Sequence, residues 1–220
     1  MMRILNIKVR HLREPFSGLS HLLGALLAVP ALIFMLMNLP EQQAGTYLTS
    51  YLVFSVSMFL MFGSSAVYHL MEISELGLRK LKRIDHIAIF IMIAGSYTPY
   101  CLLGLEGSLS WMMFALIWAI AIAGVLIKIF YLHAPRWLST LLYVGMGWVA
   151  LLIYEPLSNN LSSEAVDWLF AGGVVYTLGA IVYATKWPNI HRQHFNFHDL
   201  WHIFVLAGAT CHFISIALYL

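Results

Sequence analysis

The residues best suited to chemistry are two histidines at the start of the last apolar segment. His198 and His202 are four residues apart, and this spacing places side chains one above the other on a helix face. Both imidazoles can therefore reach one metal ion. The segment that follows is almost wholly apolar, and polar groups at the membrane edge of such a helix need a reason. Taken alone, the pair fits a metal site or two interfacial histidines hydrogen-bonded to neighbours.

The composition indicates the surroundings of these histidines. The chain has 220 residues, of which 61% are hydrophobic and 10% are charged, whereas soluble domains carry about 25% charged residues. We therefore expect one integral membrane domain over residues 1–220, with no room for a second domain. The net charge of +2 is too small to suggest nucleic acid as a partner.

Seven apolar runs divide the chain, and each is near the ~20 residues that a membrane-spanning helix needs. The connections between them are short. The sequence therefore predicts an all-α fold, a seven-transmembrane helix bundle, with helices at roughly 18–39, 47–71, 84–104, 111–132, 137–155, 166–186 and 199–220.

The basic residues predict the orientation of this bundle. With seven spans, all 12 lysines and arginines fall on one side of the membrane. The connections on the opposite side carry acidic residues, such as Glu41 and Glu106, and no base. The positive-inside rule then places the N-terminus in the cytoplasm and the C-terminus outside.

This topology brings polar residues from three helices to one depth. His69 ends the second span, Asp85 begins the third, and the pair His198 and His202 begins the seventh, all near the cytoplasmic side. At 1.5 Å per residue they lie within about two turns of one level. Three imidazoles can bind one zinc ion and leave a fourth position for water, which is the ligand set of a catalytic site.

Two further residues could take part in the chemistry. Asp85 could accept a proton from an activated water or orient it, although a salt bridge to Lys82 or Arg83 is an equally simple role. Ser65 lies one turn before His69 and could hydrogen-bond to the water or to a developing oxyanion. A backbone hydrogen bond within its own helix is as good an interpretation of Ser65.

Together these motifs resemble the hemolysin III family, the bacterial branch of the progestin and adipoQ receptor superfamily, which is distantly similar to alkaline ceramidases. The resemblance extends from Ser17-x-x-x-His21 to the C-terminus. It rests on Ser65-x-x-x-His69, Asp85-His86, Gly95-Ser96-Tyr97-Thr98-Pro99, His198-x-x-x-His202 with Phe204-Val205-Leu206, and Cys211-His212-Phe213.

The resemblance implies a zinc ion (Zn2+) near the cytoplasmic leaflet of a bacterial inner membrane. It implies His69, His198 and His202 as ligands, Asp85 as the water-orienting residue or base, and Ser65 as its hydrogen-bonding partner. It further implies a role in membrane lipid homeostasis, since the related eukaryotic proteins are associated with hydrolysis of ceramide-like amides.

Three hypotheses follow. The first is an intramembrane hydrolase that uses zinc-activated water on an amide or ester of a membrane lipid. The second is a non-enzymatic sensor or regulator in which zinc only ties the second and seventh helices together. The third, an ion or metal transporter, is weaker because only His212 and a few hydroxyls lie deeper in the predicted bundle, so the polar residues form no path.

Overall fold

The computed structural model describes residues 12–131, 135–188 and 195–220, and this part of the chain is helical, as predicted. Seven of its helical segments are long and apolar enough to cross a membrane. The elements are α1 (Pro15–Met37), α2 (Ala44–Leu70), α3 (Glu75–Gly104), α4 (Gly107–Phe130), α5 (Arg136–Gly147), the 3₁₀ helix η1 (Trp148–Ile153), α6 (Tyr154–Asn160), α7 (Ser163–Thr185) and α8 (Phe197–Tyr219).

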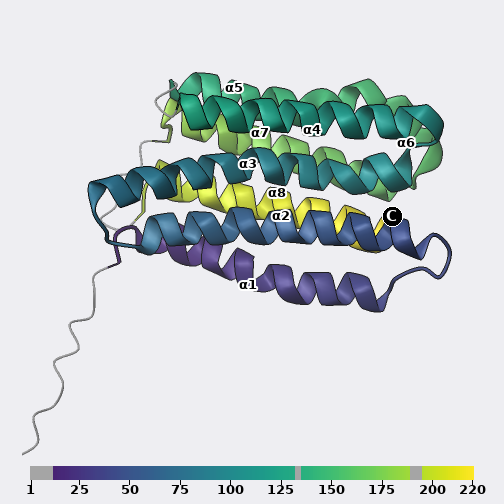
Figure 1. The fold of residues 1–220 in the computed structure, drawn as a ribbon, viewed down its shortest axis with the longest axis horizontal. Helices are drawn as coiled ribbons and strands as arrows, with labels where there is room; N and C mark the ends of the chain where they lie inside the picture. Colours follow the sequence, from purple (N-terminus) through teal and green to yellow (C-terminus); the bar gives the residue numbers. More distant parts are fainter. Residues whose placement is uncertain (1–11, 132–134, 189–194) are drawn as a thin grey trace, which may run out of the picture.

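The spans lie side by side with their axes roughly parallel (Figure 1), and their contacts close into a ring. Consecutive helices α1 to α5 are neighbours, α5 packs on α7, α7 on α8, and α8 returns to α1. α3 also contacts α6 and α8. The outer faces are apolar, with exposed side chains such as Leu26 and Ile122, which suits contact with lipid.

α3 begins at Glu75, well before the predicted start at residue 84. The Ser74 hydroxyl caps the helix by accepting a hydrogen bond from the backbone N–H of Gly77, and Glu75 supplies negative charge in the first turn. Hydropathy detects only the apolar part of a helix, so it does not reveal that the basic residues before 84 are helical. Their helical conformation places Lys82 on the same helix as Asp85.

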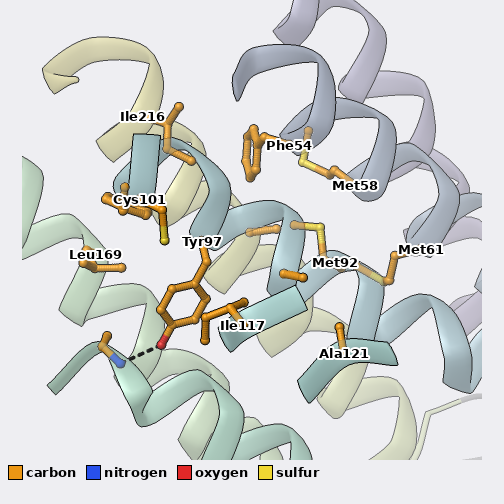
Figure 2. Packing of buried hydrophobic residues seen from close by; sticks show 14 of the residues in the cluster. Phe54, Met58, Met61, Met92, Tyr97, Cys101, Ile117, Ala121, Leu169 and Ile216 are labelled. Carbon is orange, nitrogen blue, oxygen red and sulfur yellow. Dashed lines mark hydrogen bonds between the residues drawn. The ribbon is translucent and has the colours of Figure 1, made fainter. Parts of the chain in front are cut away.

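The fifth span changes from α-helix to 3₁₀ helix at Trp148 and continues as α6. The cause is Tyr97, whose hydroxyl donates to the carbonyl of Gly147 (2.5 Å) and accepts from the N–H of Ala150 (2.7 Å). Figure 2 shows the ring of Tyr97 reaching from α3 to this second contact. A side-chain hydroxyl that takes the place of backbone hydrogen bonds interrupts the α-helix. The apolar run 137–155 gives no sign of this interruption.

The core between α2 and α3 is tightly packed around Met58, Met61 and Met92 (Figure 2). Gly95 allows this closeness, because a Cβ at this position would lie 2.5 Å from Ser57 Cβ and 3.3 Å from the carbonyl oxygen of Val53. Neither neighbouring atom can rotate away, since both are fixed to the α2 backbone.

We expect Gly95→Ala to lower the free energy of unfolding by about 1–3 kcal/mol, because overpacking forces α2 and α3 apart. The measurement is thermal unfolding of the detergent-solubilised protein. Gly63→Ala on α2 is the matched control, since, its own helix backbone aside, no atom of the described residues lies within 4 Å of a Cβ there. A Gly95 variant as stable as this control would contradict the close packing.

Candidate metal centre and membrane cavity

Three histidines from two helices converge at one end of the bundle. His69 lies in the last turn of α2, and His198 and His202 lie in the first turns of α8. One ring nitrogen from each lies within 4.8 Å of the others. Nε2 of His198 and Nε2 of His202 are 3.2 Å apart. The four-residue spacing of His198 and His202 thus brings their side chains together on one face of α8, as the sequence predicted.

This group fits a tetrahedral metal ion. Zinc–nitrogen bonds of 2.0–2.1 Å put two ligand atoms about 3.3–3.4 Å apart, close to the separation of the His198 and His202 nitrogens. Imidazole nitrogen is a donor that zinc, copper, iron and nickel all accept. His69 and His202 are buried, so their ring nitrogens converge away from bulk water. The donor set, and the separation of its α8 pair, suit a divalent transition-metal ion.

A carboxylate that the sequence analysis did not single out orients His69. Nδ1 of His69 hydrogen-bonds to Oε2 of Glu14, and the backbone N–H of Glu14 donates to the carbonyl of His69 (3.0 Å). The hydrogen bond from His69 holds the pKa of Glu14 below its ordinary value, against the effect of partial burial. Glu14 therefore stays ionised and fixes Nδ1 as the donor, which leaves Nε2 of His69 free to bind a metal.

The start of α8 is fixed to α1 by Asp199. Its Oδ1 accepts from the Ser17 hydroxyl (2.6 Å), and its Oδ2 accepts from the backbone N–H of Asn196 (2.9 Å) in a capping box. Asp199 is buried and lies between the two candidate ligands in sequence. The Asn196-x-x-Asp199 spacing was a usable signal for the cap, whereas the link to Ser17 depends on the fold.

The predicted site residue Ser65 is buried on α2 and contacts α1. Its Oγ lies 2.8 Å from Nδ1 of His21. The ring of His21 stacks on that of His202 with centroids 3.9 Å apart, and Nε2 of His21 has no hydrogen-bond partner among the described residues. When Nδ1 of His21 carries the ring hydrogen, Ser65 accepts from it and keeps its own proton to donate.

Asp85 lies on α3 and lines the same cavity as the histidines. Its Oδ2 is 3.5 Å from Nδ1 of His86, and its side chain is largely buried. Its charge acts on His69 and His21. Within the described residues no salt bridge joins it to Lys82 or Arg83, so the simple structural role considered from sequence is not formed.

These groups share one cavity of about 1370 Å³. Its polar end is lined by the three candidate ligands, Ser65 and Asp85, and its walls continue along Met92, Val205, Leu169 and Leu157 to His212. His202 and His212 are ten residues apart on one helix, a rise of about 15 Å. The ring of His212 stacks on Tyr176, with centroids 5.5 Å apart. The cavity therefore offers a polar head and a long, mainly apolar body.

Fold and site define a class: multi-pass membrane proteins with seven apolar helices and a cavity that a three-histidine cluster lines at one end. Residues 9–213 match the family model described as "Haemolysin-III related". The chain belongs to this family, as the resemblance indicated.

Curated relatives agree with this assignment. The chain is 37% identical to "Hemolysin-3" of Bacillus cereus, over 94% of this chain and 91% of the relative, and 34% identical to the "Hemolysin-3 homolog" of Bacillus subtilis, over 94% and 93%. It is 25% identical to the human "Monocyte to macrophage differentiation factor", over 89% of this chain and 81% of the relative. This distant match fits the wider progestin and adipoQ receptor superfamily.

Proposed function

We propose that the protein is a zinc-dependent hydrolase that cleaves an amide or ester bond of a membrane lipid and serves membrane lipid homeostasis. The observation that carries this proposal is the convergence of His69, His198 and His202 at the head of a long, mainly apolar cavity with Asp85 on its wall. His69, held by Glu14, would bind the ion together with the two α8 histidines. When bound, zinc supplies Lewis acidity that activates water at neutral pH.

The chain's own residues would perform the remaining tasks. The Asp85 carboxylate would take the proton of the attacking water and return it to the leaving group. Ser65 would donate a hydrogen bond to the oxygen on which negative charge develops. The apolar walls around Val205 and Leu169 would hold the acyl chain and exclude water, so that the scissile carbonyl rests at the polar end.

The proposed setting is the cytoplasmic membrane of a bacterium, with the N-terminus in the cytoplasm. Its support is the segregation of charge along the bundle: Arg79 and Lys82 in the first turns of α3, Lys128 in the last turn of α4 and Lys186 after α7 all lie at the end that carries the histidines. Lipid would enter the cavity sideways from the bilayer or from the cytoplasmic mouth.

The direct test of the proposed function is fatty acid release by the purified, zinc-loaded protein from a panel of lipid amides and esters. The proposal predicts release from at least one of them that ends when zinc is chelated. Release from none by a folded, zinc-loaded protein would refute hydrolysis.

A second candidate function is a membrane sensor in which the same zinc is structural. It is favoured by the placement of the ligands, because His69 is on α2 and the others are on α8, and α1 lies between these helices as the neighbour of both. A metal there would tie two separated helices together. Asp85→Asn separates the two functions, since it should abolish hydrolysis yet leave zinc content and a sensor phenotype intact.

We expect Glu14→Ala to lower zinc affinity by about 10–100-fold, the usual cost of losing the carboxylate that orients a histidine ligand. The zinc affinity of Glu14→Gln should lie between those of the wild type and Glu14→Ala, because the amide oxygen still accepts from Nδ1 of His69. The measurement is competition for zinc with a chromogenic chelator. Glu75→Ala is the control, since its exposed side chain pairs, among the described residues, with Arg79 alone. Wild-type affinity in the Glu14 variants would show that His69 needs no such partner.

A further inference from the structure

The wall of the cavity also carries a buried cation. Lys128 ends α4 with 1% of its surface exposed, and it lines the cavity together with Lys82 of α3. The hydrogen bond that the described residues give its Nζ is to Ser139 Oγ (2.5 Å) on α5. An ammonium has three N–H donors, so the bond to Ser139 leaves two N–H groups of Lys128 for other acceptors.

The charge of Lys128 is not balanced within the described part of the chain. No carboxylate lies within 4.0 Å of Lys128 or Lys82 there, and the charge of Lys82 repels that of Lys128. Two of the cavity's carboxylates are engaged elsewhere, Glu14 with His69 and Asp199 with Ser17, and the third, Asp85, lies 3.5 Å from His86 rather than beside either lysine. A buried charge without a partner is costly, so such groups are normally paired.

We propose that Lys128, Lys82 and Ser139 bind the phosphate of an anionic lipid whose acyl chain lies in the cavity. Phosphate suits these groups, because the two ammonium groups supply the charge while the Ser139 hydroxyl, which accepts from Lys128, donates its own proton to a phosphate oxygen. A lipid is favoured over free phosphate because the site opens on the same cavity as the apolar walls at Met92 and Leu169.

The site lies beside the proposed catalytic groups. Tyr143 of α5, which also lines the cavity, donates to the carbonyl of His86 (3.1 Å), the residue that follows Asp85. Ser139 lies one turn before Tyr143 on the same face of α5, so a phosphate held at Ser139 and Lys128 would direct the first bonds of the lipid toward Asp85. If the bound anionic phospholipid is also the substrate, that assignment rests on the proposed hydrolysis. The binding of the lipid phosphate at Lys128 does not depend on hydrolysis.

The test is binding by the full chain in nonionic detergent to three probes: oleoyl lysophosphatidic acid, monooleoylglycerol with the same chain and no phosphate, and glycerol phosphate with no chain. Wild type is expected to bind the phosphorylated lipid at least about 30-fold more tightly than monooleoylglycerol, the lower end for a buried charge pair. Lys128→Met should remove most of this preference. Lys82→Met, a change at an exposed side chain that folding tolerates, should reduce it by about tenfold.

Lys80→Met is the matched control, because Lys80 is an exposed α3 lysine outside the cavity and should keep the preference. Equal binding of the two lipids by wild type, or a preference unchanged in both the Lys128 and Lys82 variants, would overturn the proposal. Glycerol phosphate binding as tightly as the lipid would overturn the lipid assignment. Repeating the titration with Asp85→Asn separates binding from hydrolysis, since binding should persist there whether or not the wild type turns over.

Discussion

Replacing Asp85 with asparagine is expected to lower lipid hydrolysis by about 10²–10⁴-fold, the usual contribution of a positioned proton acceptor. Asparagine matches the size of aspartate but cannot take a proton from the attacking water. Zinc content should stay at the wild-type level, because the candidate ligands are on α2 and α8 whereas Asp85 is on α3. The measurement pairs fatty acid release with metal analysis of the same preparation.

Asp167→Asn provides the control for this experiment. Asp167 is exposed near the start of α7, at the opposite end of the bundle from the histidines. The substitution removes the same negative charge as Asp85→Asn. The Asp167 variant should hydrolyse lipid at the wild-type rate. An Asp85 variant that retained full activity would remove Asp85 from the mechanism. If the Asp85 variant lost zinc together with activity, Asp85 would be part of the metal site.

The double change His198→Ala/His202→Ala is expected to abolish the stabilisation that zinc gives. A ligand at 100 times its dissociation constant stabilises the folded state by about 2.7 kcal/mol. For a chain of this size that corresponds to a rise in melting temperature of roughly 5–10 °C. Wild type should show this rise between chelator and added zinc, and the double variant should show none.

His212→Phe is the comparison for this shift. His212 lies on the same helix and lines the same cavity, but it is about 15 Å from His202 along α8 and cannot reach the ion. Its zinc-induced shift should equal that of wild type, whatever its own melting temperature. A shift retained in the double variant would place the zinc at another site.

The sequence supplied the helices and the residues that meet at one end. Seven apolar runs mark the spans because each span is long and apolar. Their alternating direction across the membrane predicts that His69 and His198 lie at the same level. The proximity of their ring nitrogens then followed from the antiparallel course of α2 and α8. Their role as ligands, and the roles of Asp85 and Ser65, stay predictions.

The residues that the sequence did not reveal act through contacts between distant segments. Glu14 precedes the first apolar run and gives no sign that it reaches His69, because their link depends on how α1 packs beside α2. Lys128 resembled any base that flanks a membrane span, and only the packing of α4 against α5 buries it. The break at Trp148 has the same origin, since the Tyr97 hydroxyl comes from α3.

The measurement that tests the central claim most directly is the metal content of the detergent-purified wild-type protein by mass spectrometry, beside His198→Ala/His202→Ala. The account predicts about one zinc per wild-type chain and none in the double variant, because three imidazoles with one open position form a zinc site. A folded wild-type protein without bound metal after incubation with zinc would contradict it. The histidines would then be packing groups of the bundle, and neither the hydrolase nor the zinc-linked sensor would stand.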